Sequence, residues 1–297
     1  MVTFDLASFN AEHEEFLGVA TWWTIYQGSV ILGQVENALR AEGLATDLVK
    51  EPSPKKAFSR AAKKLDKDHR NVFARKIRDG ADRAVVGIVR ESADAVAETL
   101  DYDQQVTAHL NKESGTLTTY QPKDGNGGDA VAKEFQESFD EFRQVLTDAD
   151  LRLMVREVIR RAGGVPLRQS GGIYFIPKSE VGTMVRVDGV LRRLGLGQMY
   201  FMRVPDGVSE KNIAWTSAEQ EIRERVERIL IATDRIEKRA KCLVKQEARF
   251  KEVERLFEAY QELTEAEEQA DNLRDYLREA GGRIAEKLAE LQAAQVS

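Results

Sequence analysis

Arginines recur at every fourth residue from Arg152 to Arg160, and this spacing places their side chains along one face of a helix. Arg161 and Arg168 follow closely in the chain. A row of guanidinium groups can bind phosphates, because each group releases counterions and donates charge-assisted hydrogen bonds. The sequence therefore predicts contacts with a nucleic-acid backbone at five arginines, which are Arg152, Arg156, Arg160, Arg161 and Arg168.

A second basic helical face is predicted just after Ser53. This serine provides an N-cap, and Pro54 takes the first helical position, where its missing N–H costs nothing. Residues 50–90 carry 13 basic and five acidic side chains, whereas residues 91–150 carry four and 14. The basic side chains either bind a polyanion or neutralise the acidic segments inside the fold. The candidate phosphate contacts on this helix are Lys56, Arg60, Lys63, Lys64 and Lys67.

The arginine-bearing helix is expected to lead directly into a β-hairpin. An apolar stripe that includes Leu151 and Val155 lies on another side of the helix and is expected to pack. Gly163 ends the helix, and the two hairpin strands flank a turn at Gly171–Gly172. A helix followed by a hairpin that carries Arg168 resembles a winged-helix arrangement, in which both elements grip the nucleic-acid backbone.

Motifs for the common enzyme chemistries are absent from the sequence. It contains no phosphate-binding loop, no H-E-x-x-H zinc motif, no G-x-S-x-G nucleophile and no G-x-G-x-x-G dinucleotide motif. Asp101 and Asp103 point to the same side of a predicted strand, a spacing that can hold Mg²⁺, although such pairs are common on exposed strands. Cys242 is the only cysteine and is expected to be a small packed residue. We expect no catalytic residue, no metal site and no cofactor.

The first part of the chain predicts an antiparallel sheet with flanking helices. Residues 19–26 have the β-branched and aromatic content of a buried strand. Four more strands are expected at residues 72–77, 84–91, 97–110 and 115–121, because turn sequences separate them. Together these strands would form one sheet, on which helices at residues 31–42 and 54–67 lie. A linker is expected at residues 122–129.

The end of the chain predicts long helices. A capping box at Thr216–Glu219 opens a helical pattern that continues to about Gln292. Apolar residues alternate spacings of four and three, which is the seam of a heptad repeat and favours pairing of subunits. A second capping box at Thr264–Glu267 and the pair Gly281–Gly282 are two places where the helix could fold back. The expected oligomerisation residues are Ile222, Val226, Ile229, Ile236 and Leu243.

Composition describes a protein rich in charged helix. Of the 297 residues, 42% are hydrophobic and 32% are charged. No apolar run approaches the roughly 20 residues that span a bilayer, and residues 1–15 lack the basic region of a signal peptide. We therefore expect a cytoplasmic protein of the α+β class. Its three expected parts are an α+β sheet domain at 1–125, a helix–hairpin–helix unit at 129–215 and a helical coiled-coil arm at 216–297.

Several stretches resemble an uncharacterised protein family of actinobacterial genomes and their phages. They are the WWTI strand with its following helix, PKKAFSRA from Pro54, TDADLRLMVREVIRRAGGVPLR from Thr147, and the hairpin SGGIYFIP. The similarity covers approximately residues 20–205 and leaves the coiled coil as an extension. Its motifs are structural, and the resemblance implies a bacterial or phage protein of a mobile element without implying any activity.

Three functional hypotheses remain open at this point. The first is a non-enzymatic, oligomerising nucleic-acid-associated protein, whose arm pairs subunits and whose basic faces contact phosphates. The second is a structural or scaffold protein that binds protein partners through its coiled-coil arm, with the basic segments consumed by internal ion pairs. The third is a metal-dependent nuclease that uses the strand carboxylates.

Overall fold

The chain forms two compact units in the computed structural model, which describes residues 16–94, 99–121, 128–168, 172–236, 240–264 and 266–296. Unit 1 groups residues 1–26, 42–44 and 152–297, and unit 2 groups residues 27–41 and 45–151. The expectation about residues 1–15 and most of the predicted linker lie outside the described residues. The three-part domain division stays a prediction.

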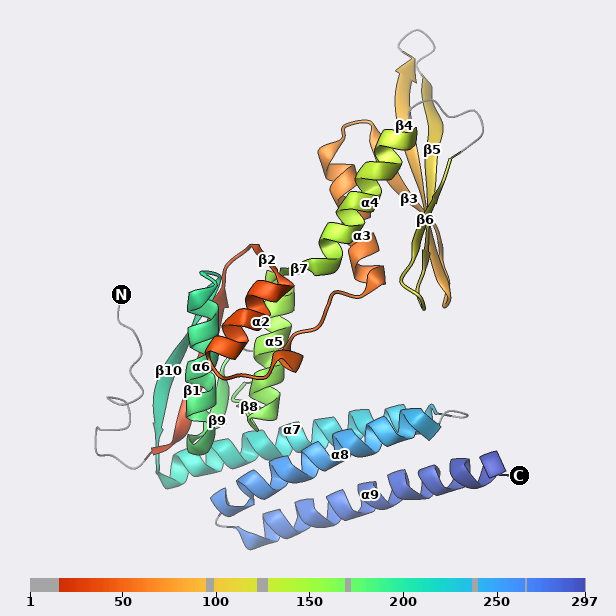
Figure 1. Cartoon of the computed structure of the whole chain (residues 1–297). Helices are drawn as coiled ribbons and strands as arrows, with labels where there is room; N and C mark the ends of the chain where they lie inside the picture. Colours follow the sequence, from red (N-terminus) through yellow and green to blue (C-terminus); the bar gives the residue numbers. More distant parts are fainter. Residues whose placement is uncertain are drawn as a thin grey trace. The chain divides into compact units, whose positions relative to one another are not determined.

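Unit 2 is built on an antiparallel sheet with two helices on one face, as Figure 1 shows. The sheet order is β3-β4-β5-β6, and each strand pairs with the next along the chain. Phe58 of the first helix meets Phe135 of the second edge to face, at 5.4 Å between ring centroids. The elements are β3 (Val72–Asp79), β4 (Arg83–Asp94), β5 (Thr99–Asn111), β6 (Leu117–Tyr120), α3 (Pro54–Asp68) and α4 (Gly128–Gln144). The predicted meander is therefore confirmed.

Local signals define α3 as the sequence predicted. The side chain of Ser53 accepts a hydrogen bond from the Lys56 backbone N–H at 3.3 Å, and Pro54 opens the helix. Phe58 and Leu65 are buried against the sheet. Unit 2 also contains the helix α2 (Leu32–Ala41), the short 3₁₀ helix η1 (Thr46–Leu48) and a two-stranded ladder of β2 (Ser29–Ile31) with β7 (Val145–Thr147).

Unit 1 contains a second antiparallel sheet, of order β10-β1-β9-β8. Its strand β1 (Phe16–Ile25) pairs with β10 (Gly197–Pro205) on one side and with β9 (Tyr174–Pro177) on the other. The prediction that this first strand joins the four-stranded meander is wrong, and so is the placement of helix 31–42 on that meander, because α3 and α4 are the helices in its core. The sequence could not predict the pairing of β1 with β10, because the paired residues are far apart in the chain: Trp22 lies opposite Tyr200, almost 180 residues later.

The helix–hairpin unit is present in the predicted order. Helix α5 (Asp148–Arg161) buries its apolar stripe, including Leu151 and Val155, and Gly163 follows it with a φ of 65°. Strand β8 (Val165–Pro166) then pairs with β9, and the 3₁₀ helix η2 (Lys178–Glu180) and α6 (Val181–Arg193) follow. Residues 169–171 of the predicted turn lie outside the described residues.

Three long helices complete unit 1, and Figure 1 shows them side by side. They are α7 (Val208–Asp234), α8 (Ala240–Tyr260) and α9 (Glu267–Val296), with the 3₁₀ helix η3 (Gln261–Leu263) before α9. The Thr264 hydroxyl accepts a hydrogen bond from the Ala266 N–H at 3.1 Å, so the predicted break there is confirmed. Two details are wrong: Thr216 lies inside α7, and Gly281–Gly282 lies inside α9.

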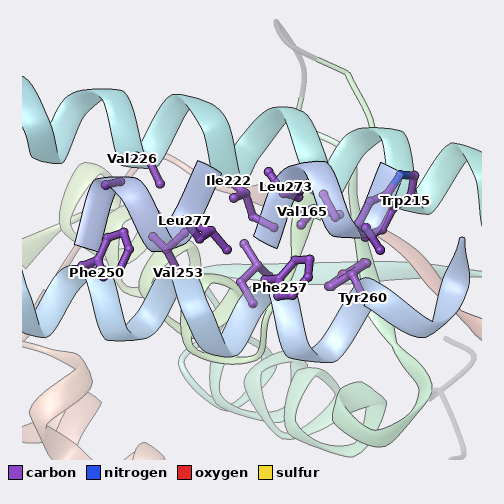
Figure 2. Close-up of a cluster of buried hydrophobic side chains, with 14 of the residues drawn as sticks. Val165, Trp215, Ile222, Val226, Phe250, Val253, Phe257, Tyr260, Leu273 and Leu277 are labelled. Carbon is purple, nitrogen blue, oxygen red and sulfur yellow. The ribbon is translucent and has the colours of Figure 1, made fainter. Parts of the chain in front are cut away.

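The helices pack around a shared apolar core, shown in Figure 2. Trp215 of α7, Tyr260 of α8 and Leu273 of α9 are each at most 2% exposed. Val165 of β8 and Phe175 of β9 belong to the same cluster, so the core joins the helices to the sheet of unit 1. The predicted α+β class with long C-terminal helices is confirmed, and the helices fold back on one another. In the described part of the chain, none of the helices is long and apolar enough to cross a membrane.

Candidate nucleic-acid interface

Two of the predicted phosphate contacts on α3 point to a carboxylate of the same unit. Arg60 Nη2 donates to Asp150 Oδ2 at 2.6 Å, and Lys56 Nζ forms an ion pair with the same carboxylate. Arg60 also donates to the Val145 carbonyl and the Thr147 hydroxyl, each at 3.0 Å. Burial raises the pKa of Asp150, but hydrogen bonds from Lys56, Arg60 and Thr147 outweigh burial and lower it to about 2. This cluster holds α3 to the start of α5.

The other cations of α3 divide between pairing and exposure. Lys64 forms an ion pair with Glu141 of α4 at 3.0 Å. Lys63 and Lys67 are exposed, and no ion pair joins either of them to another residue in the described ranges. Of the predicted lysine contacts on this helix, these two are therefore the ones that point to solvent.

The arginines of α5 are also largely engaged within unit 1. Arg160 pairs with Glu157 at 2.6 Å and with Glu252 of α8, and Arg161 Nε lies 2.9 Å from Glu157. Arg152 donates to the Ile25 carbonyl at 3.0 Å. The hydrogen bond from Arg160 is the main reason that the pKa of Glu157 falls to about 2.

Arg156 and Arg168 are exposed. They remain candidates for the predicted phosphate contacts, but the continuous cationic row expected on the helix is interrupted by its own carboxylate partners. Helical spacing could have identified Glu157, which lies three and four residues before Arg160 and Arg161, but it could not show that Glu252 of α8 would face the row.

The expected oligomerisation seam lies mainly inside unit 1. Ile222, Val226 and Leu243 are fully buried, Ile229 is 5% exposed, and Ile236 is half-buried. Three of them belong to the core that α7 shares with α8 and α9. The apolar surface that motivated subunit pairing is thus covered within one chain, and oligomerisation stays an untested prediction.

Replacing Ile222 tests whether the seam stabilises a single chain or joins two subunits. We expect Ile222→Ala to lower the free energy of unfolding by about 3 kcal/mol, because it opens a cavity in the core. We expect the molar mass from light scattering to stay unchanged, and the thermal midpoint to be independent of protein concentration. A smaller mass for the variant than for the parent chain would show instead that the seam joins subunits.

The carboxylates considered for a nuclease lie on an exposed part of β5. Asp101 lies opposite Ser92 and Asp103 opposite Arg90, and both aspartates are exposed. Gln105 Nε2 donates to Asp103 at 2.5 Å. Among the residues that the structure describes, no group of three or more histidine, cysteine, aspartate or glutamate side chains could hold a metal ion.

A surface that the sequence analysis missed lies on the second face of the unit 2 sheet. Core residues such as Val86, Ile88 and Val106 face α3 and α4. Since side chains alternate along strands, the residues between them point the other way. We call this surface the open face, and its residues include Phe73, Arg75, Ile77, Arg83, Thr107, His109 and Tyr120.

The open face combines aromatic rings with guanidinium groups. The Arg75 guanidinium lies over the Phe73 ring at 4.6 Å from its centroid, and the His109 and Tyr120 rings meet edge to face at 4.7 Å. Tyr120 is 55% exposed and Ile77 is 60% exposed. Within the described part of unit 2, neither a helix nor another strand buries these side chains.

Charge is unevenly distributed on the open face. Arg75 is exposed and has no ion-pair partner among the residues described, whereas Arg83 lies 4.0 Å from Asp82 at the β3–β4 turn. Toward the far end of β4, Glu91 accepts a hydrogen bond from Tyr102, and this contact is the main reason that the pKa of Tyr102 is raised. The face is therefore cationic around Arg75 and acidic around Glu91.

A period of two in the strand sequence could have identified this face. In VFARKIRD, Phe73, Arg75 and Ile77 occupy alternate positions, and this pattern places a ring, a cation and an apolar side chain on one side of β3. The lysines of α3 form a stronger sequence pattern than this one, because they are more numerous and recur with a helical period.

Unit 1 has a separate apolar hollow of about 420 Å³ beside β1. Trp22, Trp23, Ile173 and Met202 line it together with a glycine. Trp22 stacks on Tyr200, and Trp23 stacks on a tyrosine of β9, each pair at 5.5 Å between ring centroids. These tryptophans are only half-buried, so they provide exposed ring surface as well as strand packing.

Comparison with known proteins places the chain in a family. Residues 16–295 match the model of a family of unknown function, DUF6744. The chain belongs to this family. The match extends through α9, so the expectation that the C-terminal helices are an extension beyond the family region is wrong. Searches of curated proteins and of solved structures gave no match. Membership in DUF6744 therefore carries no activity to this chain.

Proposed function

We propose that this chain is a non-enzymatic nucleic-acid-associated protein, and that the open face of unit 2 is its contact surface. The observation that carries the proposal is the exposed Arg75 guanidinium, which lies over the Phe73 ring on an uncovered sheet face. Arginine beside an aromatic ring is suited to nucleic acids, because it offers charge to phosphates and a flat surface to bases.

Other cations of unit 2 are exposed away from the open face. Lys76 lies opposite the core residue Val86, so it points to the helix side of the sheet, and Lys63 and Lys67 are on α3, which covers that side. These side chains are free of ion pairs within the described ranges, unlike Lys56 and Arg60. The proposal does not require oligomerisation, because the surface belongs to one unit. A role in a phage or mobile element rests on the sequence resemblance alone.

Binding should depend strongly on salt. With about three phosphate contacts, we expect the affinity for a fluorescently labelled oligonucleotide to fall about 20- to 40-fold between 50 and 200 mM salt, measured by anisotropy. Arg75→Glu should weaken binding by about a further tenfold, because it removes a charged contact and repels phosphate. Lys133→Glu is the matched control, since Lys133 is 78% exposed on α4.

An equal loss in the two variants would show that only the total charge matters, and would remove the open face from the proposal. Absence of any shift at 50 mM salt with DNA or RNA would contradict nucleic-acid association altogether. That result would favour the second candidate, a scaffold protein that binds protein partners. The observation that favours this second function is the tryptophan-lined hollow of unit 1, which has the apolar character of a protein contact.

A further inference from the structure

Building on the proposed function, we infer that the open face binds single-stranded nucleic acid by stacking unpaired bases on its aromatic rings, in preference to duplex. The inference concerns the same site and names its ligand class. It comes from how rings, cations and carboxylates are placed on the sheet.

The rings lie on both edges of a four-stranded sheet. Phe73 is on edge strand β3, and Tyr120 is on the other edge strand, β6. The register runs from Arg75 through Gly87 and Thr107 to Tyr120, so Arg75 and Tyr120 lie in one row across the sheet. Three strand spacings make this row about 14 Å long. A four-stranded sheet with aromatic side chains on its uncovered face can stack two or three bases.

The exposure of Tyr120 suits stacking. Tyr120 is 55% exposed, and its ring meets the His109 ring edge to face. Such a contact occupies at most one face of the Tyr120 ring, so the other face is left for a base. The Ile77 side chain lies 3.0 Å from the point that a Cβ on Gly87 would occupy. Glycine at this position therefore lets an apolar side chain lie across the middle of the face.

The charges on the open face determine where the phosphates of a bound nucleic-acid strand would lie. Phosphates are attracted to Arg75 on edge strand β3, and are repelled at the end of the face where Glu91 accepts a hydrogen bond from Tyr102. Bases, which are uncharged, can then lie over the rings between the edges. In a duplex, paired bases are stacked on one another, so their faces are closed to Tyr120 and Phe73, and a broad sheet face offers no element that enters a groove.

The test compares a single-stranded 12-nucleotide DNA, its RNA counterpart and the corresponding DNA duplex at 50 mM salt, using fluorescence anisotropy and the full-length chain. We expect the single strands to bind at least tenfold more tightly than the duplex. Tyr120→Ala should weaken single-strand binding about tenfold, because one base loses its stacking partner. Tyr120→Phe should retain the affinity, since it keeps the ring.

Tyr26→Ala is the matched control. Tyr26 is 49% exposed but belongs to unit 1, outside the open face. We expect this variant to bind single strands as tightly as the parent chain does. If thermal melting shows that Tyr120→Ala disturbs the fold, Phe73→Ala provides the same test at the other edge.

The outcomes separate this inference from the proposed function. Equal affinity for single strand and duplex, unchanged in Tyr120→Ala, would overturn base stacking and leave nucleic-acid association standing. Binding to duplex in clear preference to single strands would overturn it too. Failure of every oligonucleotide to bind at 50 mM salt would overturn both, and would direct attention to protein partners of the open face.

Discussion

Asp150→Ala is expected to lower the free energy of unfolding of unit 2 by about 3 kcal/mol. The carboxylate has a side chain only 13% exposed and accepts hydrogen bonds from Lys56, Arg60 and Thr147. Removing it leaves the Arg60 guanidinium, itself 16% exposed, without its anion, and breaking a buried pair in this way is costly. Urea unfolding followed by far-UV circular dichroism measures the loss.

Asp140→Ala serves as the control, because Asp140 is an exposed aspartate of α4. We expect a change within about 0.5 kcal/mol for this variant. A loss in Asp150→Ala no larger than that of the control would mean that the cluster contributes nothing to holding α3 against the start of α5.

The same carboxylate gives unit 2 an acid-sensitive contribution to stability. The pKa of Asp150 is lowered in the folded chain, from an ordinary value of 3.8 to about 2. Its contribution of about 2 kcal/mol is therefore complete above pH 4 and is lost as the pH falls toward 2. The difference in unfolding free energy between the parent chain and Asp150→Ala should consequently shrink from about 3 to about 1 kcal/mol in this acidic range, whereas an undiminished difference at pH 2 would contradict the assigned cause.

Trp215→Ala is expected to have the largest effect in unit 1, about 4 kcal/mol of unfolding free energy. The Trp215 side chain is 2% exposed, meets the Phe257 ring edge to face and donates from Nε1 to Gln269 Oε1 at 3.1 Å. The substitution therefore removes contacts of α7 with both α8 and the first turn of α9. All three tryptophans of the chain lie in unit 1, so fluorescence of Trp22 and Trp23 still reports its unfolding in the variant.

Ile213→Ala is the control on the same helix, because Ile213 is 54% exposed. We expect the urea midpoint of this variant to stay close to that of the parent chain. Similar midpoints for the two variants would show that the apolar core of the three helices is not what stabilises unit 1.

Local features of the fold could be predicted, because their causes are close together in the chain. The N-cap of α3 depends on Ser53 and Pro54, and the end of α5 depends on Gly163, whose φ of 65° suits glycine. Turn sequences likewise separated the strands of the unit 2 meander. The position of β1 could not be predicted, because its partners are about 150 to 190 residues away and apolar strands do not specify a particular neighbour.

In the candidate site, too, features set by nearby residues could be predicted and contacts with distant residues could not. Helical spacing identified the cationic faces of α3 and α5, but not the partners that are distant in sequence and neutralise them. Asp150 is 90 residues from Arg60, and Glu252 is 92 residues from Arg160. The heptad seam at Ile222 predicted an apolar contact correctly, yet a seam alone does not tell whether its partner is another subunit or a later helix of the same chain.

The hydroxyl of Tyr260 donates to the carbonyl of Gly163 at 2.8 Å, so a side chain from α8 satisfies the backbone just beyond α5. During synthesis this bond must wait until 97 further residues have left the ribosome. The pairing of β1 with β10 spans an even longer stretch of sequence, so it forms later still. Every contact of unit 2, by contrast, is available once residue 151 has emerged. The contacts within the inserted unit thus become available while the unit that surrounds it in sequence is still being translated, and a chain released early would present β1 without its neighbours.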